Sequence, residues 1–293
     1  MFGWTIEQER SFAVLDAYFA AGGNFIDTAD LYGRRGPEGE GGSERIIGRW
    51  IAARGNRSQL VIATKVGMSR ELRGLSRETI RRAIDASLQR LGIDRVDLYY
   101  AHQDDPGTPL TETLGAFGEL IDEGLIGYAG ASNYSAERLE EALLLGAREG
   151  LASYVVLQPH YNLLERDYEG ALTAVAERHG LACVPYFGLA RGFLTGKYRR
   201  DGPDIESPRA QSVREDYFDE RGFAALDALD AVAQAHRTSV AAVALAWLIA
   251  QPTVLAPIAS ATSPEQLAEL LPATELRLSP AELSLLREAG AQA

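Results

Sequence analysis

Four side chains of different chemical types could together move a proton on and off an oxygen atom. Asp27 and Tyr32 share the stretch NFIDTADLYG, Lys65 lies in VIATKVG, and His102 ends LYYAH. A tyrosine phenol has a pKa near 10 and is a weak acid at neutral pH. A nearby ammonium favours the phenolate, and a carboxylate paired with the ammonium holds that cation in place. These residues therefore predict acid–base chemistry at a carbonyl or alcohol oxygen, with Tyr32 as the proton donor.

Short apolar runs along the chain predict the strands that would position these groups. The runs are of strand length and apolar throughout, which is typical of strands buried on both faces of a sheet. Asp27, Lys65, His102, Asn133 and Gln158 each lie at or just beyond the end of one run. The seven runs are 24–27, 60–66, 96–102, 126–130, 154–158, 182–186 and 254–259.

Amphipathic segments between these runs predict helices. Ser76 and Ser135 are suited to cap the helices expected over 76–91 and 135–148. Strand and helix alternate along the chain without a linker, which indicates a parallel sheet covered by helices. The apolar residues expected on the buried faces of these two helices are Ile80, Ile84, Leu88, Leu91, Leu139, Leu143 and Leu144.

We predict an α/β fold of the (β/α)₈ TIM-barrel type, with one domain over residues 1–293. A closed barrel is favoured over an open sheet because the polar strand-end residues would converge at one mouth. No GxGxxG turn follows an early strand, so the fingerprint of open-sheet dehydrogenases is missing. Only seven runs are found, so the segment Met1–Trp4 is expected to be the tail of a truncated first strand, unless the true start lies upstream.

Composition excludes several classes of protein. Acidic residues outnumber basic ones by 41 to 29, and the formal net charge of −12 disfavours nucleic acid as a partner. No apolar stretch approaches the roughly 20 residues that span a bilayer, and no signal segment is seen, so we expect a cytoplasmic protein with no membrane partner. The single cysteine, Cys183, allows neither an internal disulfide nor a thiolate metal cluster and is expected in the core.

Several ordered motifs resemble those of the aldo-keto reductase family. They are NFIDTADLYG with SERIIG downstream, ATKVG, DLYYAHQDD and IGYAGASNYS, and the resemblance runs from residue 3 to near residue 271. The positions that match the family's catalytic set are Asp27, Tyr32, Lys65 and His102. The resemblance implies that Tyr32 is the general acid and base. Lys65 and Asp27 would tune its pKa, and His102 would orient the substrate carbonyl.

The resemblance also implies a nicotinamide cofactor and the reduction of an aldehyde or ketone to an alcohol, or the reverse. NADP is expected, with NAD left open, because Thr262 stands where the family often has a cation for the 2′-phosphate. Gly188 replaces a frequent proline, which would loosen its loop. The matching cofactor positions are Asp27, Ser132, Asn133, Gln158, Tyr186, Leu189, Arg191, Lys197, Ser260, Thr262, Gln266 and Glu269.

The substrate is expected to be a small carbonyl compound bound near Tyr32 and His102. Trp4 would line this pocket or, equally, plug the barrel, and the insertions 34–42 and 199–218 would form its walls. The oligomeric state is expected to be a monomer or a small homo-oligomer.

Two other functions stay open at this stage. One is a non-catalytic regulatory subunit that senses a nicotinamide cofactor, because some members of the family regulate membrane channels. The other is metal-assisted chemistry in a barrel, with Asp27, His102 and His160 as ligands. No HxH or HExxH spacing supports a metal site.

Overall fold

The computed structural model describes residues 2–291, and within it the chain divides into two compact units. Of the described residues, the first unit holds 2–158, 178–181 and 260–264. The second unit holds 159–177, 182–259 and 265–291.

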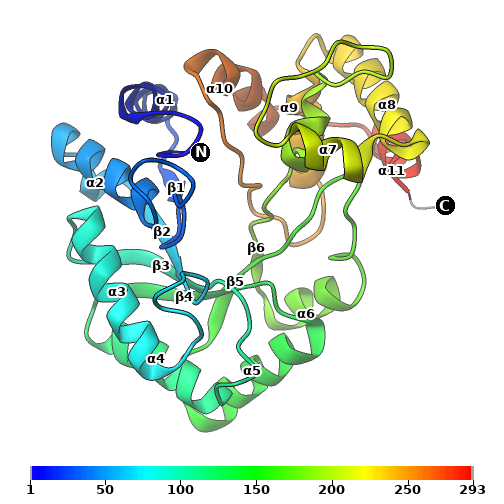
Figure 1. The fold of residues 1–293 in the computed structure, drawn as a ribbon. Helices are drawn as coiled ribbons and strands as arrows, with labels where there is room; N and C mark the ends of the chain where they lie inside the picture. The colour runs from blue at the N-terminus through cyan, green and yellow to red at the C-terminus, as the bar shows by residue number, and fades with distance from the viewer. Residues whose placement is uncertain (1, 292–293) are drawn as a thin grey trace. The chain divides into compact units, whose positions relative to one another are not determined.

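The first unit is built on five parallel strands, which pair in chain order (Figure 1). Their carboxyl ends lie at one edge of the sheet because all five run in the same direction. The register places Lys65 beside Tyr100 and Ser132 beside Gln158. The strands are β1 (Phe25–Asp27), β2 (Val61–Val66), β3 (Val96–Ala101), β4 (Ile126–Ser132) and β5 (Tyr154–Gln158).

Helices connect these strands, as the alternation in the sequence predicts. Ser76 caps α3 by accepting from the Thr79 N–H at 3.2 Å, and Ser135 caps α5 by accepting from the Arg138 N–H at 3.2 Å, so both predicted caps are confirmed. α1 (Gln8–Ala20) precedes β1, and the connections are α2 (Gly42–Arg54), the 3₁₀ turn η1 (Arg57–Gln59), α3 (Arg77–Leu91), α4 (Leu110–Asp122) and α5 (Ala136–Glu149).

The predicted buried faces of α3 and α5 are confirmed with one exception. Leu88 is half-buried, whereas Leu144 is 56% exposed. A step of one residue turns a helix by about 100°, so Leu144 lies off the apolar stripe that Leu139 and Leu143 form. The prediction for Leu144 was wrong because a neighbouring leucine in the sequence is not a neighbour on the helix face. The members of the two faces that are fully buried are Ile80, Ile84, Leu91, Leu139 and Leu143.

The second unit is mainly helical. Its longest helix is α8, and α9 is buried along almost its whole length. Within residues 2–291, no single helix is long and apolar enough to cross a membrane, and only the pair α8 and α9, bent by 97° at its break, meets that test. The elements are α6 (Ala171–His179, whose end belongs to the first unit), β6 (Ala182–Cys183), the 3₁₀ turn η2 (Ala190–Thr195), α7 (Ala210–Tyr217), α8 (Glu220–His236), α9 (Val240–Ile249), α10 (Pro264–Leu270, which begins in the first unit), the 3₁₀ turn η3 (Leu271–Thr274) and α11 (Pro280–Ala289).

Two of the predicted strands are shorter than expected. The run 182–186 is a strand only at β6, and the run 254–259 makes only an isolated parallel bridge between Val254 and Cys183. Two backbone hydrogen bonds join the same segments. The Leu255 N–H donates to the Cys183 carbonyl and the Ile258 N–H to the Pro185 carbonyl, both at 2.8 Å. Proline has no N–H to donate to a ladder, and each run contains one, so a continuous strand is interrupted.

The segment ahead of α1 is a turn rather than the end of a strand. A bridge joins Phe2 to Ile6, and the Gly3 N–H donates to the Ile6 carbonyl at 3.1 Å. Gly3 has a φ of 71°, which no strand residue adopts. The expectation of a strand remnant at Met1–Trp4 was wrong for the part that is described, and Met1 lies outside the described residues.

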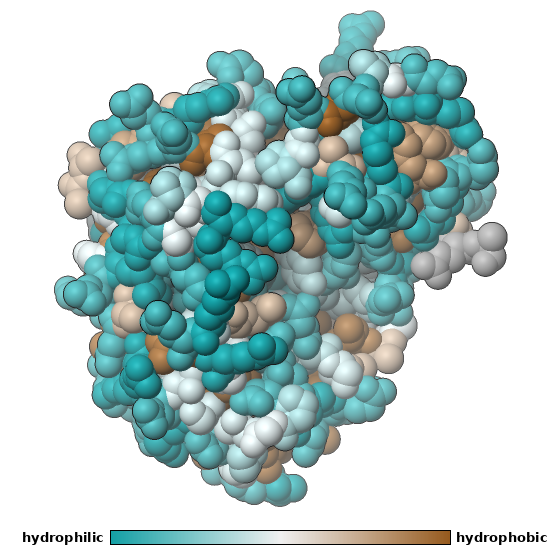
Figure 2. Space-filling model, in the orientation of Figure 1, coloured by the Kyte–Doolittle hydropathy of each residue, from teal (hydrophilic) through white to brown (hydrophobic). Residues whose placement is uncertain are grey.

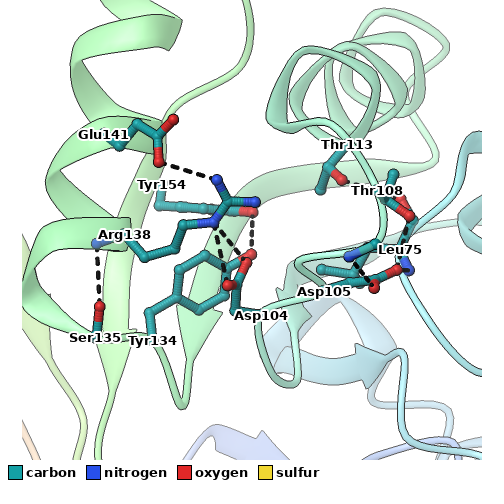
Figure 3. Close-up of polar contacts among 11 residues, drawn as sticks. Leu75, Asp104, Asp105, Thr108, Thr113, Tyr134, Ser135, Arg138, Glu141 and Tyr154 are labelled. Carbon is teal, nitrogen blue, oxygen red and sulfur yellow. Dashed lines mark hydrogen bonds and ion pairs between the residues drawn. The ribbon is translucent and has the colours of Figure 1, made fainter.

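Polar residues cover most of the face seen in Figure 2. In the first unit, apolar side chains from neighbouring strands pack against one another. Ala63, Leu98 and Tyr100 form a buried cluster of the sheet, with Phe25 and Val156 packed against it. The five parallel strands and their connecting helices establish the α/β class.

The contact between α2 and α3 depends on a glycine. A Cβ at Gly48 would lie 2.6 Å from the carbonyl oxygens of Arg90 and Leu91, so Gly48→Ala is expected to destabilise the protein by about 1–3 kcal/mol. Gly118, inside α4, is the matched control, since a Cβ there meets its nearest atom at 3.7 Å. Gly118→Ala should stabilise by about 0.5–1 kcal/mol. Urea unfolding of both variants measures the difference, and equal effects would contradict the close approach.

Candidate active site

A buried ion pair lies where β1 and β2 end. The Lys65 side chain is fully buried, and its Nζ donates to Asp27 Oδ2 at 2.5 Å and to the Thr28 carbonyl at 2.7 Å. The other carboxylate oxygen, Asp27 Oδ1, accepts from Gln158 Nε2 at 2.9 Å. Because both oxygens of Asp27 are hydrogen-bonded, the two charges are held in one geometry away from water.

Lys65 carries its proton at neutral pH. Burial acts to lower its pKa, but the charge of Asp27 and then the interaction with Tyr32 outweigh burial and raise the pKa above its ordinary value. Lys65 Nζ lies 4.9 Å from the centroid of the Tyr32 ring. The ammonium therefore faces the phenol from the buried side.

The imidazole of His102 stands beside Tyr32. The two rings meet edge to face, with centroids 5.9 Å apart and planes at 77°. His102 is 7% exposed, and its pKa lies well below the ordinary value because of burial and then the charge of Lys65. The ring is therefore neutral at pH 7. Within residues 2–291, its Nδ1 is buried and has no hydrogen-bond partner.

Three amide and hydroxyl groups adjoin this cluster at the ends of β4 and β5. Ser132 Oγ donates to the Gln158 carbonyl at 2.8 Å, and Asn133 Nδ2 donates to Ser132 Oγ at 3.1 Å and to the His102 carbonyl at 2.8 Å. Asn133 adopts a φ of 56°, a left-handed conformation that asparagine tolerates. Seven predicted site residues thus lie within one unit: Asp27, Tyr32, Lys65, His102, Ser132, Asn133 and Gln158.

Trp4 belongs to the same unit and is half-buried. The Arg35 guanidinium lies 5.4 Å from the centroid of its ring. A Cβ at Gly36 would meet the Gly3 carbonyl oxygen at 1.6 Å, so the insertion 34–42 packs directly on the segment that carries Trp4. Ser260, which is exposed, and Thr262, which is half-buried, also belong to this unit.

The predicted stacking residue, Tyr186, lies in the second unit. His160 stacks on its ring with centroids 5.2 Å apart and planes at 12°, and Phe187 contacts both rings nearly edge-on. The Tyr186 N–H donates to the Pro159 carbonyl at 2.9 Å, which ties the two segments together. The sequence reasoning considered His160 only as a metal ligand, and no local motif marks it as the partner of Tyr186.

The predicted pyrophosphate loop of the second unit follows Tyr186. Leu189 precedes η2, and Arg191 has a φ of 56°, pairs with Asp216 and lies 5.4 Å from the Phe187 centroid. Burial and then the charge of Arg209 lower the pKa of Lys197. The remaining predicted residues, exposed on α10, are Gln266 and Glu269.

Gly188 is closely packed in this loop. A Cβ there would lie 2.9 Å from Leu248 Cδ1 and 3.3 Å from Leu245 Cδ2, on α9. A side chain at position 188 would therefore have to displace these leucines, whereas the loosening of the loop stays a prediction.

The described residues include further buried titratable groups. Sequence reasoning missed Asp30 and Glu44, two buried carboxyl groups near Tyr32. Their signal was a charged residue inside each of two otherwise well-patterned motifs, NFIDTADLYG and SERIIG. In the part of the chain that is described, no three His, Cys, Asp or Glu side chains are grouped so as to hold a metal ion. Cys183 is buried as predicted, and burial raises the pKa of its thiol to about 12.

Comparison with known proteins identifies the family of this chain. The chain matches the aldo/keto reductase family over residues 1–291. It is 33% identical to the aldo-keto reductase str7 of Strobilurus tenacellus, over 98% of this chain and 83% of that protein. It is 32% identical to the L-glyceraldehyde 3-phosphate reductase of Escherichia coli (strain K12), over 92% and 80%. It is also 32% identical to a probable voltage-gated potassium channel subunit beta of Oryza sativa subsp. japonica, over 94% and 85%.

The structure thus defines an α/β protein with a buried lysine–carboxylate pair beside a phenol and a neutral imidazole. The chain belongs to the aldo/keto reductase family, and the resemblance found in its motifs is confirmed.

Proposed function

We propose that the protein reduces an aldehyde or ketone to an alcohol with a reduced nicotinamide nucleotide, or catalyses the reverse reaction, with Tyr32 as general acid and base. The observation that carries this proposal is the hydrogen-bonded series from Gln158 through Asp27 to Lys65, which fixes an ammonium 4.9 Å from the Tyr32 ring centroid. No other buried cation lies against a half-buried phenol with these partners among the described residues of the first unit.

Each residue of the site has a separate task. Lys65 favours the ionised form of Tyr32, because the interaction between an ammonium and a phenolate is attractive from either side. Asp27 keeps Lys65 charged and in place. Tyr32 gives its proton to the carbonyl oxygen as the alcohol forms and takes it back in the oxidation. His102 is neutral and its buried Nδ1 has no partner in the described part of the chain, so it orients the carbonyl by hydrogen bonding.

The residues present fit a nicotinamide nucleotide. His102 Nδ1, which is buried and has no hydrogen-bond partner among residues 2–291, suits an oxygen atom of the substrate. The polar groups of Ser132 and Asn133 suit the oxygen and nitrogen atoms of a carboxamide. Tyr186, backed by His160, offers an aromatic ring for stacking. When bound, the nucleotide supplies the hydride. We propose NADP as the preferred form, with NAD as the alternative.

We further propose that both units belong to one (β/α)₈ barrel domain over residues 1–293, acting on a small carbonyl substrate as a monomer or small homo-oligomer. The match to the family over residues 1–291 supports a single domain. Trp4 and the insertions 34–42 and 199–218 would form the substrate walls.

A tryptophan-fluorescence titration with NADPH and with NADH tests the cofactor. Saturable quenching by either nucleotide, followed by turnover of a panel of aldehydes and ketones, is the expected result. Failure of both nucleotides to bind would overturn the proposal.

A regulatory subunit that senses the cofactor is the second candidate, because relatives include a probable voltage-gated potassium channel subunit beta. This function predicts tight nucleotide binding with no turnover of any carbonyl, so the same titration and substrate panel separate the two.

Thr262 is a direct test of cofactor preference. Thr262→Arg is expected to tighten NADPH binding relative to NADH by about tenfold or more, since a hydrogen bond to a charged group contributes roughly 1.5–3 kcal/mol. The ratio of the two dissociation constants from fluorescence titration measures this. Thr262→Gln, which adds bulk without charge, should leave the ratio unchanged; an equal gain there would exclude a phosphate contact.

A further inference from the structure

A second buried carboxyl group lies in the turn that carries Tyr32. Asp30 is 4% exposed, and within residues 2–291 no side chain donates a hydrogen bond to its carboxyl group, which the backbone N–H of Leu31 alone approaches. Most buried polar side-chain atoms in proteins are hydrogen-bonded, so a buried carboxyl group without a side-chain donor is unusual. Asp30 takes no part in the chemistry proposed above.

The charges that face Asp30 are unbalanced. From α2, the fully buried Glu44 uses both oxygens elsewhere, accepting from Thr64 Oγ1 and from Arg90 Nε, each at 2.6 Å. Glu40 adds a further negative charge, and the buried Tyr99 of β3 interacts with Asp30 as well. Arg90, on α3, is the cation among these groups and is already paired with Glu44.

An ionised Asp30 would therefore be strongly unfavourable in this geometry. Among the described residues it would be a buried anion without a paired cation or a side-chain donor, close to the negative charge of Glu44. Burial and then the charge of Glu44 raise the pKa of Asp30 to about 7, although Arg90 acts to lower it. The carboxyl group consequently changes its charge close to neutral pH.

Any movement of Asp30 reaches Tyr32 through a short stretch of backbone. The Tyr32 N–H donates to the Ala29 carbonyl at 3.1 Å, and the Ser43 N–H donates to the Tyr32 carbonyl at 3.2 Å. The Asp30 N–H donates to the Lys65 carbonyl at 3.4 Å. Backbone hydrogen bonds thus connect the turn of Asp30 both to Tyr32 and to β2, the strand that carries Lys65.

We propose that Asp30 is a positioning residue for Tyr32: its neutral carboxyl lets the turn 28–32 pack against Glu44 and α2, and loss of its proton displaces that turn. The proposal rests on the function proposed for Tyr32. It assigns to Asp30 and Glu44 a pH response in the neutral range, separate from the chemistry of the reacting groups. Turnover should fall as the pH rises through about 7.

Labelling with [¹³Cγ]aspartate and [¹³Cζ]tyrosine tests this in the full chain without substrate. One aspartate resonance should titrate with a midpoint near 7 and be absent in Asp30→Asn. The Tyr32 resonance, assigned by its loss in Tyr32→Phe, should shift with the same midpoint in the wild type and stay constant in Asp30→Asn. A Tyr32 resonance that does not follow Asp30 would overturn the proposal.

Two further variants should affect the titration of Asp30 differently. Glu44→Gln removes a like charge and should move the Asp30 midpoint to lower pH. Asp94→Asn, an exposed control, should leave both titrations unchanged. If Glu44→Gln does not fold, the wild-type titration and Asp30→Asn still decide the matter. A midpoint that moves to higher pH in Glu44→Gln would contradict the proposed pairing.

Stability gives an independent measurement. The folded pKa of Asp30 is about 7 and its ordinary value is 3.8, so the folded state holds this proton more tightly. The contribution is present below pH 3.8 and is lost as the pH rises to about 7. The thermal midpoint of Asp30→Asn should therefore depend less on pH over this range than that of the wild type. Identical slopes would count against a raised pKa.

The kinetic arm separates this proposal from the proposed function. The positioning role is supported if the wild-type kcat falls as the pH rises through 7 and the kcat of Asp30→Asn does not depend on pH over the same range. A protein that turns over no carbonyl but whose Tyr32 resonance follows Asp30 would refute the reductase function and keep the coupling. An active enzyme with an insensitive Tyr32 resonance would do the reverse.

Discussion

Replacing Tyr32 with phenylalanine is expected to lower kcat by about 10²- to 10⁴-fold, the usual contribution of a positioned general acid. Phenylalanine keeps the ring and therefore the edge-to-face contact with His102, whose centroid lies 5.9 Å away. Only the hydroxyl is lost, so the reacting oxygen has no proton donor. Nucleotide affinity should change little, because no cofactor role is assigned to the Tyr32 hydroxyl.

Stopped-flow kinetics with saturating nucleotide, together with fluorescence titration, measures both quantities. Tyr128→Phe is the matched control, since Tyr128 is 61% exposed and should keep full activity. A Tyr32→Phe enzyme with more than a small part of the wild-type kcat would exclude Tyr32 as the general acid. A weaker nucleotide affinity in that variant would point instead to a structural role.

Replacing Lys65 with methionine is expected to cost about 3–5 kcal/mol of stability, because it leaves the carboxylate of Asp27 buried without its cation. The Asp27 side chain is 6% exposed, and within the described residues Gln158 Nε2 would be the remaining side-chain donor to it. Turnover should also be lost, because nothing then favours the ionised form of Tyr32. Urea unfolding measures the first effect and steady-state kinetics the second.

A double variant separates the lost ion pair from a simple packing defect. Lys65→Met with Asp27→Asn removes both charges and should be more stable than Lys65→Met alone. Arg82→Met, which breaks the exposed pair of Arg82 with Glu78, should cost no more than about 0.5 kcal/mol. If the double variant is as unstable as Lys65→Met, the ion pair is not the interaction that stabilises this part of the protein.

The pH dependence of the Lys65–Asp27 ion pair follows from the direction in which the pKa of Lys65 is shifted. The pKa of Lys65 is higher in the folded protein than its ordinary value of 10.5. Its contribution to stability is therefore fully present below pH 10.5 and is lost at higher pH, as the lysine deprotonates. The contribution of Lys65 is therefore intact at neutral pH.

The sequence alone was sufficient where the signal is local. Short windows of the sequence encode the serine caps of α3 and α5, the apolar face of α3 and the motifs of the four residues proposed to be catalytic. Each depends on the residues of one turn, one helix face or one strand end. The structure confirms the two caps and the helix faces, apart from the face of α5 at Leu144.

Tertiary structure decided what depends on residues far apart in the chain. Gln158 reaches Asp27 across 131 positions, and Asp30 and Glu44 become buried neighbours only when α2 packs beside the strands. The strand predicted at 254–259 shrank to one bridge because its pairing segment also contains a proline. Residue type and periodicity report the preferences of a segment, whereas burial and hydrogen-bond partners are set by the segment it meets.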